Sequence, residues 1–122
     1  MKYCWTTINV ADMQKSLGFY QDILGLKVVR RVQPGPVREI AFLGEGETQV
    51  ELICDTSNEA PIFGKDISMG FVVDSLERFG EVLRKHGIPV HSGPFQPNPS
   101  VKFIYILDPD GLRIQLVENV KQ

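Results

Sequence analysis

The segment TQVELICD, residues 48–55, alternates apolar and polar side chains, a pattern that predicts a half-buried β-strand. One face of this strand carries Val50, Leu52 and Cys54, and the opposite face carries Gln49, Glu51 and Ile53. A second segment, LRIQLVEN at 112–119, has the same pattern, with Gln115 in the place of Glu51. The likeness of the two segments indicates that the chain contains an internal repeat.

The rest of the chain extends this repeat, because each half contains four strand-like runs with a helical run after the first. Those strand-like runs are residues 4–10, 26–32, 37–43 and 48–54 in the first half, and 67–73, 88–93, 101–107 and 112–118 in the second. The segments GEGE (44–47) and DPDG (108–111) have turn composition and join the last two strands of each half as hairpins.

The two helical runs carry recognisable start and stop signals. Asp12 is the expected N-cap of the first helix and Gly25 its end, with the apolar stripe Met13, Leu17, Tyr20 and Leu24. Asp74 is the expected N-cap of the second helix, Glu77 its capping-box residue and Gly87 its end, with the stripe Leu76, Phe79 and Leu83.

The sequence therefore predicts an α+β fold of tandem βαβββ modules within one domain, residues 1–122. Module 1 spans 1–55, a polar linker spans 56–66, and module 2 spans 67–119. A module of this size cannot bury its own apolar face, so we expect the two to form a curved, mostly antiparallel sheet. The helices should cover the outer face, and the inner face should form a concave cleft.

The composition excludes several classes of partner. The formal net charge is −2 and no run of Lys or Arg occurs, so we expect no nucleic-acid partner. No apolar stretch approaches the length of a membrane span, and the N-terminus lacks a leader pattern, so we expect a cytoplasmic protein. Cys4 and Cys54 fall at inward positions of predicted strands and are interpreted as buried, reduced thiols.

Strand alternation predicts which side chains line the cleft. In the first strand, Cys4, Thr6, Ile8 and Val10 should face the helices. The expected cleft residues are Trp5, Thr7, Asn9, Glu51, Ser68, Arg113 and Gln115. The repeat should bring four of them, Trp5, Glu51, Ser68 and Gln115, to one place. Alternating polar residues are most often only a solvated sheet face, but convergent polar groups in a concavity are typical of a ligand site.

Three segments resemble the vicinal oxygen chelate superfamily, which includes glyoxalase I, bleomycin-resistance proteins and extradiol dioxygenases. They are INVADMQKSLGFYQDILGLKVV (8–29), VELI (50–53) and YILDPDGLRIQLVE (105–118). The resemblance covers nearly the whole chain and implies the same paired-module fold. It also implies a homodimer, because related proteins build their cleft from paired subunits. It does not select one activity, because the superfamily hosts several.

The resemblance also implies where a metal ion would bind. The four ligand positions of the glyoxalase I branch fall on Trp5, Glu51, Ser68 and Gln115, and of these only Glu51 is a strong ligand. We therefore expect no cofactor, or at most a weak divalent metal held by Glu51 and Gln115. The positions that hold glutathione in that branch read Asn9 and Asp55, which disfavours this tripeptide.

The two histidines do not complete a metal site. His86 ends the second helix, where a structural role is expected, and His91 precedes Gly93 and Pro94, where surface exposure is favoured.

Three functions stay open. The first is metal-independent binding of a small, possibly aromatic, molecule against Trp5. The second is a lyase or isomerase of the lactoylglutathione lyase type, in which Glu51 acts as a base or a ligand. The third is a structural or regulatory dimer module with a vestigial cleft.

Overall fold

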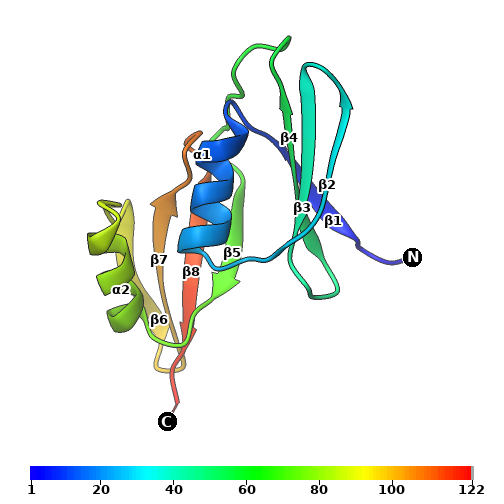
Figure 1. Ribbon diagram of the computed structural model, residues 1–122. Helices are drawn as coiled ribbons and strands as arrows, with labels where there is room; N and C mark the ends of the chain where they lie inside the picture. The colour runs from blue at the N-terminus through cyan, green and yellow to red at the C-terminus, as the bar shows by residue number, and fades with distance from the viewer. Residues whose placement is uncertain (122) are drawn as a thin grey trace. The chain divides into compact units, whose positions relative to one another are not determined.

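The computed structural model describes residues 1–121, which form eight strands and two α-helices (Figure 1). The first half contains β1 (Trp5–Asn9), α1 (Met13–Leu17), a π-helix (Gly18–Ile23), β2 (Val28–Gly35), β3 (Arg38–Leu43) and β4 (Gln49–Asp55). The second half contains β5 (Ser68–Val72), α2 (Leu76–Lys85), β6 (Ser92–Asn98), β7 (Val101–Leu107) and β8 (Arg113–Asn119). This order is the predicted α+β arrangement of two βαβββ modules.

The chain divides into two compact units, one spanning Met1–Ile62 and the other beginning at Phe63. Each unit has one four-stranded mixed sheet, with strand order β1-β4-β3-β2 in the first and β5-β8-β7-β6 in the second. Among the described strands, only β1–β4 and β5–β8 are parallel pairs, so the sheets are mostly antiparallel, as predicted. No helix within residues 1–121 is long and apolar enough to cross a membrane.

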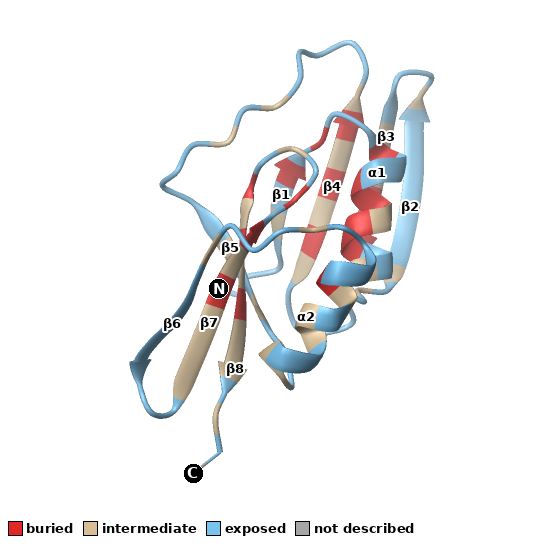
Figure 2. Ribbon diagram, turned by 90° about the vertical axis from the view of Figure 1, so that its left-hand side faces the viewer, coloured by how far each residue is buried: buried red, intermediate tan, exposed pale blue. Residues whose placement is uncertain are grey.

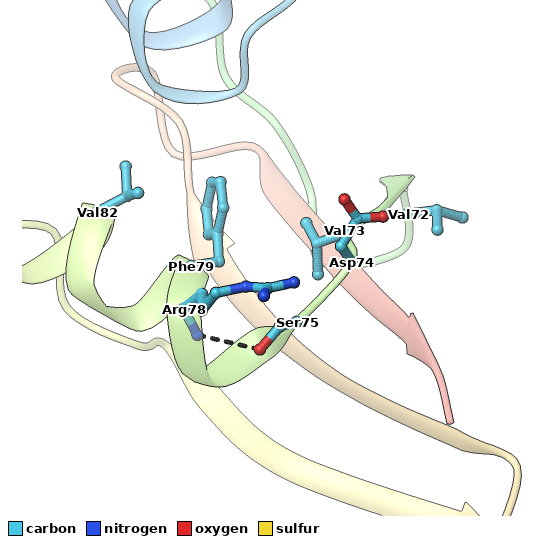
Figure 3. A pocket seen from close by; sticks show the side chains of 7 residues that line it. All are labelled: Val72, Val73, Asp74, Ser75, Arg78, Phe79 and Val82. Carbon is cyan, nitrogen blue, oxygen red and sulfur yellow. Dashed lines mark hydrogen bonds between the residues drawn. The ribbon is translucent and has the colours of Figure 1, made fainter. Parts of the chain in front are cut away.

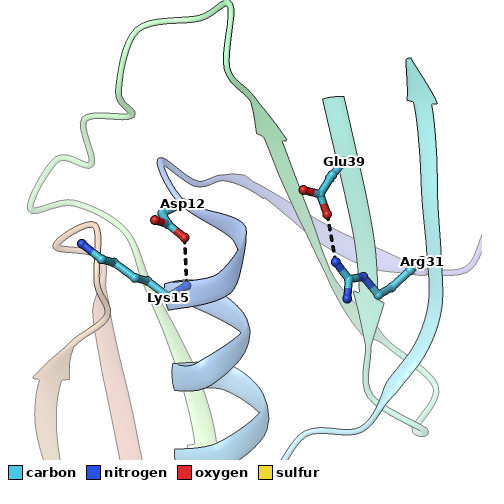
Figure 4. A network of polar contacts seen from close by, with 4 residues as sticks. All are labelled: Asp12, Lys15, Arg31 and Glu39. Carbon is cyan, nitrogen blue, oxygen red and sulfur yellow. Dashed lines mark hydrogen bonds and ion pairs between the residues drawn. The ribbon is translucent and has the colours of Figure 1, made fainter. Parts of the chain in front are cut away.

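In the first unit, α1 begins where the sequence predicts, because Asp12 Oδ1 accepts a hydrogen bond of 3.1 Å from the Lys15 N–H (Figure 4). The predicted continuation as a single α-helix to Leu24 is wrong. From Gly18 the turns widen, and the Leu24 N–H donates to the Phe19 carbonyl, five residues back, at 3.0 Å. The wider turn allows both Phe19 and Tyr20 to be buried, with their ring centroids 5.0 Å apart.

The strand β4 has the predicted alternation along its whole length. Val50, Leu52 and Cys54 are buried, whereas Glu51 and Ile53 are half-buried (Figure 2). The helix α1 packs against this strand. The prediction that Cys4 is buried is wrong: it lies outside β1, which begins only at Trp5, and its side chain is exposed.

In the second unit, the N-cap of α2 is Ser75 and not the predicted Asp74. Ser75 Oγ accepts a hydrogen bond of 3.1 Å from the Arg78 N–H (Figure 3). Glu77 therefore stands one residue before the capping-box position, so that prediction is also wrong. A further cap comes from β8, because the Leu76 N–H donates to Glu118 Oε1 at 2.7 Å.

The strand predicted at 88–93 is displaced toward the C-terminus and occupies Ser92–Asn98 instead. This strand contains Pro94 and Pro97, which the sequence pattern disfavours inside a sheet. The sheet tolerates them because β6 is an edge strand paired only with β7.

The DPDG turn leads into β8, as expected. Asp108 is 5% exposed, and its Oδ1 accepts N–H groups from Asp110 and Leu112, both at 2.9 Å. Gly111 follows with a φ of 89°, a conformation that favours glycine. This turn fixes the start of the strand that carries Arg113 and Gln115.

Candidate functional site

A row of four side chains crosses the sheet of the first unit on the face opposite Val50, Leu52 and Cys54. The register pairs Thr7 of β1 with Glu51 of β4, Glu51 with Phe42 of β3, and Phe42 with Arg30 of β2. Paired residues point to the same side of a sheet, so these four lie side by side. We call Thr7, Glu51, Phe42 and Arg30 the first-unit row.

Glu51 is held in this row by its neighbour on β1. The Thr7 hydroxyl donates to Glu51 Oε1 at 2.5 Å. Glu51 is half-buried and forms no ion pair with any other residue in the described range 1–121. The carboxylate is therefore oriented by one hydrogen bond, and its second oxygen can accept a donor from a ligand.

Two aromatic rings form an apolar surface beside this carboxylate. Trp5 is 42% exposed and Phe42 only 4%, and their ring centroids lie 5.1 Å apart in an edge-to-face arrangement. Arg30 completes the surface, because its Cζ lies 4.4 Å from the centroid of the Phe42 ring. This is a cation–π contact on the open face of the sheet.

The sequence predicts Trp5, Thr7 and Glu51 as site residues of this unit but not Phe42 or Arg30. Phe42 was detectable, because alternation along β3 sets it opposite the fully buried Ala41 and Leu43. Arg30 was not, because an irregularity of register between Val28 and Arg30 breaks the alternation of β2.

On the second unit, the register pairs Ser68 with Arg113, and Gly70 with Gln115. Gln115 is half-buried. A Cβ added at Gly70 would lie only 3.3 Å from the Oε1 of Gln115. The absence of a side chain at Gly70 therefore makes room for Gln115. Arg113 donates from Nη2 to the Lys65 carbonyl at 2.7 Å, and this bond ties the end of the linker to β8.

Three aromatic rings that were not predicted as site residues lie together on the sheet of the second unit. Phe95, Phe103 and Tyr105 have centroid separations of 5.4, 5.8 and 6.4 Å. The register pairs Tyr105 with Gln115, so this cluster shares its face with the predicted residues. Arg113 stacks against the cluster, with its Cζ 5.1 Å from the Tyr105 ring centroid.

The predicted cleft residues thus fall into two groups. Trp5, Thr7 and Glu51 lie together in the first unit, with Asn9 exposed further along β1. Ser68, Arg113 and Gln115 lie together in the second unit. The meeting of Trp5, Glu51, Ser68 and Gln115 at one place stays a prediction.

Neither histidine joins these groups. His86 is the C-cap of α2, with its Nδ1 2.9 Å from the Val82 carbonyl oxygen. His91 is exposed, and its N–H donates to the Tyr105 carbonyl at 2.7 Å.

At the end of β4, Asp55 carries a second carboxylate. Its Oδ1 accepts from the Ser57 hydroxyl at 2.5 Å and from the Ser57 N–H at 3.0 Å. These bonds, with a smaller contribution from Arg38, hold the pKa of Asp55 below its ordinary value. The Asp55 carboxylate is therefore negatively charged at neutral pH.

A hollow of about 440 Å³ lies at the start of α2 (Figure 3). Its lining residues are Val72, Val73, Asp74, Ser75, Arg78, Phe79 and Val82. None of the predicted site residues belongs to it, so it does not alter the assignment of the candidate site.

Comparison with known proteins places this chain in a family. Residues 2–116 match the Glyoxalase/Bleomycin resistance protein/Dioxygenase superfamily. The chain belongs to this superfamily. It is 28% identical to a lactoylglutathione lyase of Haemophilus influenzae, over 98% of this chain and 93% of that protein. It is 30% identical to a probable lactoylglutathione lyase of Synechocystis, over 93% and 92%.

A solved structure of similar fold is the trypanothione-dependent glyoxalase I of Leishmania major. Its TM-score to this chain is 0.82 at 25% identity, covering 97% of this chain and 86% of the other. The expected glyoxalase-like fold is thereby confirmed.

The residues at the metal positions of the glyoxalase I branch do not fit a tightly held divalent ion. An indole at Trp5 cannot ligate, and the Ser68 hydroxyl and Gln115 amide are weak neutral ligands. One oxygen of Glu51 already accepts the Thr7 hydroxyl. Within residues 1–121, no three His, Cys, Asp or Glu side chains gather closely enough to hold an ion.

Proposed function

We propose that this glyoxalase-like protein binds a planar aromatic small molecule, without a metal ion, on the open sheet face that carries Trp5 and Glu51. The observation that carries this proposal is the edge-to-face pair of Trp5 and Phe42 at a position where the glyoxalase I branch has a metal ligand. Trp5 has exposed ring surface for stacking, and Glu51 has an oxygen available to accept a hydrogen bond.

The second unit supplies further surface of the same kind. Its face carries Phe95, Phe103 and Tyr105, with Arg113 and Gln115 beside them. On this face, Ser68 pairs with Arg113 and Gly70 with Gln115, so we propose Ser68, Arg113 and Gln115 as polar ligand contacts of the second unit. In the first unit, we propose Thr7 and Asn9 as the polar contacts that accompany Trp5 and Glu51.

Intrinsic fluorescence tests this proposal, because Trp5 is the only tryptophan in the chain. The protein is treated with a chelator and titrated with a panel of one- and two-ring aromatic compounds. We expect at least one compound to change the Trp5 emission in a saturable way in metal-free buffer. Unchanged emission across the whole panel would contradict the proposal.

A second candidate function is catalysis, which the relatives named lactoylglutathione lyase favour. The oriented carboxylate of Glu51 would then act as a general base that removes a proton next to a carbonyl. The assay uses the hemithioacetal of glutathione and methylglyoxal, with the protein supplied with nickel or zinc. Turnover that the variant Glu51→Gln loses would favour this candidate, and no turnover in the parent protein would remove it.

We further propose that the protein is a cytoplasmic homodimer, as the family resemblance implies. Sedimentation equilibrium should give twice the chain mass of 13.7 kDa. A dimer that binds none of the panel and turns over no substrate would instead favour a structural or regulatory module with a vestigial cleft.

A further inference from the structure

We infer that the ligand is an aromatic acid: its carboxylate pairs with Arg30, and a hydroxyl or amine at its opposite end donates to Glu51. This inference rests on the proposed function and adds the chemical class of the ligand.

The first observation is that Arg30 has no carboxylate partner within residues 1–121. The adjacent Arg31 differs, because its Nη2 forms an ion pair of 2.8 Å with Glu39 (Figure 4). Arg31 pairs across the strands with Ala41, and Arg30 pairs with Phe42. The two arginine side chains therefore point to opposite faces of the sheet. On the open face, the Arg30 guanidinium therefore has no ion-pair partner among the described residues.

The second observation is how Arg30 is held. Its guanidinium lies over the Phe42 ring, with Cζ 4.4 Å from the centroid. A guanidinium stacked on a ring keeps its N–H groups at the periphery, where they can donate two parallel bonds to a carboxylate. Arg30 is exposed, so these donors are accessible. The stacking restricts the conformations of this long side chain in the free protein. Less conformational entropy is therefore lost when a ligand binds.

The third observation is the position of Glu51 relative to this cation. Phe42 on β3 lies between Arg30 on β2 and Glu51 on β4. The backbone of Arg30 is therefore two strand spacings, about 10 Å, from the backbone of Glu51. The two charged groups form no ion pair with each other. A ligand that satisfies both needs an acceptor at one end and a donor at the other.

The exposed ring surface lies beside this line. Trp5 contacts Phe42 edge-to-face and keeps 42% of its surface exposed, so an aromatic ring can stack there while its ends reach the two polar groups. The second unit repeats the arrangement: Arg113 stacks on Tyr105 and also lacks a carboxylate partner among the described residues. Both open faces thus offer a cation supported by an aromatic ring.

Three matched compounds test the inference by isothermal titration calorimetry on the metal-free protein. They are 6-hydroxy-2-naphthoate, its neutral analogue 6-hydroxy-2-naphthamide, and 2-naphthoate, which lacks the donor. We expect the hydroxy acid to bind about tenfold more tightly than either analogue, because each analogue loses one charge-assisted contact.

The variant Arg30→Gln should abolish the preference for the acid over the amide, whereas the control Arg31→Gln should keep it. Glu51→Gln should reduce the preference for the hydroxy acid over 2-naphthoate. Thermal unfolding of each variant confirms that it folds. Equal binding of acid and amide by the parent protein, or equal loss in the two arginine variants, would overturn the inference while the proposed function stands. No binding of any of the three would overturn the inference, and the proposed function would then be decided by the fluorescence panel alone.

Discussion

Glu51 interrupts an otherwise regular strand, and its neighbours explain why the strand tolerates it. The side chain lies on the open face, receives the Thr7 hydroxyl and is only half-buried. The carboxylate therefore keeps solvent access while it is oriented. A single residue with these properties suits a binding or catalytic contact better than a core position.

Asp55 gives a residue-scale prediction for the same strand. The variant Ser57→Ala removes the hydroxyl donor that contributes most to the lowered pKa of Asp55, so this pKa should rise toward its ordinary value. Carboxyl carbon NMR during a pH titration measures it. The control Thr56→Val, which removes a hydroxyl that donates to the Val37 carbonyl, should leave it unchanged. An unaltered Asp55 titration in Ser57→Ala would be evidence against this contact.

The lowered pKa of Asp55 also determines how its contribution to stability depends on pH. A carboxyl whose pKa is lower in the folded state stabilises that state at pH above its unfolded pKa. The contribution is lost as the pH falls through the folded pKa. Ser57→Ala should therefore lower stability at neutral pH and make little difference at strongly acidic pH, as measured by urea unfolding.

Phe42 gives a second prediction at this scale. The ring is 4% exposed and supports both Trp5 and Arg30. Phe42→Ala should lower the free energy of unfolding by about 3 kcal/mol, because it leaves a cavity beneath the side chains of Trp5 and Arg30. Phe95→Ala should lower it clearly less, because that ring is 44% exposed. Similar losses of unfolding free energy in the two variants, measured by urea unfolding, would mean that Phe42 does not support Trp5 and Arg30.

At the scale of elements, the N-cap of α2 is a feature in which the prediction and the structure differ. Ser75→Ala should lower the free energy of unfolding by about 1 kcal/mol, because it removes the acceptor for the Arg78 N–H. Asp74→Ala is the matched control and should have a smaller effect, because Asp74 lies outside the cap. A larger loss of unfolding free energy in Asp74→Ala would indicate that Asp74 is the N-cap, as the sequence pattern predicts, and would contradict the assignment of Ser75.

Elements with a strict pattern could be predicted, and those set by tertiary contacts could not. The alternation of β4 and β8 was visible in the sequence because each buries one face. At α2, two adjacent residues could both cap, and Glu118 of β8 contributes a contact that no local pattern reveals. The position of β6 was missed because its prolines are acceptable only at an edge, which is a property of the sheet.

For the whole molecule, the internal repeat predicted the paired-module fold. The resemblance of residues 8–29, 50–53 and 105–118 indicated the superfamily that the comparison confirms. The candidate site was predicted in part. Trp5, Thr7 and Glu51 followed from alternation along single strands, and alternation along β3 also indicates Phe42. Arg30 and the ring cluster of Phe95, Phe103 and Tyr105 depend on cross-strand register. Register is fixed by bulges and turns over many residues, which single-strand patterns do not reveal.

The most direct test of metal-independent binding is the dissociation constant of 6-hydroxy-2-naphthoate, measured by calorimetry on one preparation before and after addition of zinc or nickel. Our account predicts saturable binding by the chelator-treated protein, with a dissociation constant that the metal leaves unchanged. Binding that occurs only after the metal is added, or no binding in either state, would contradict it.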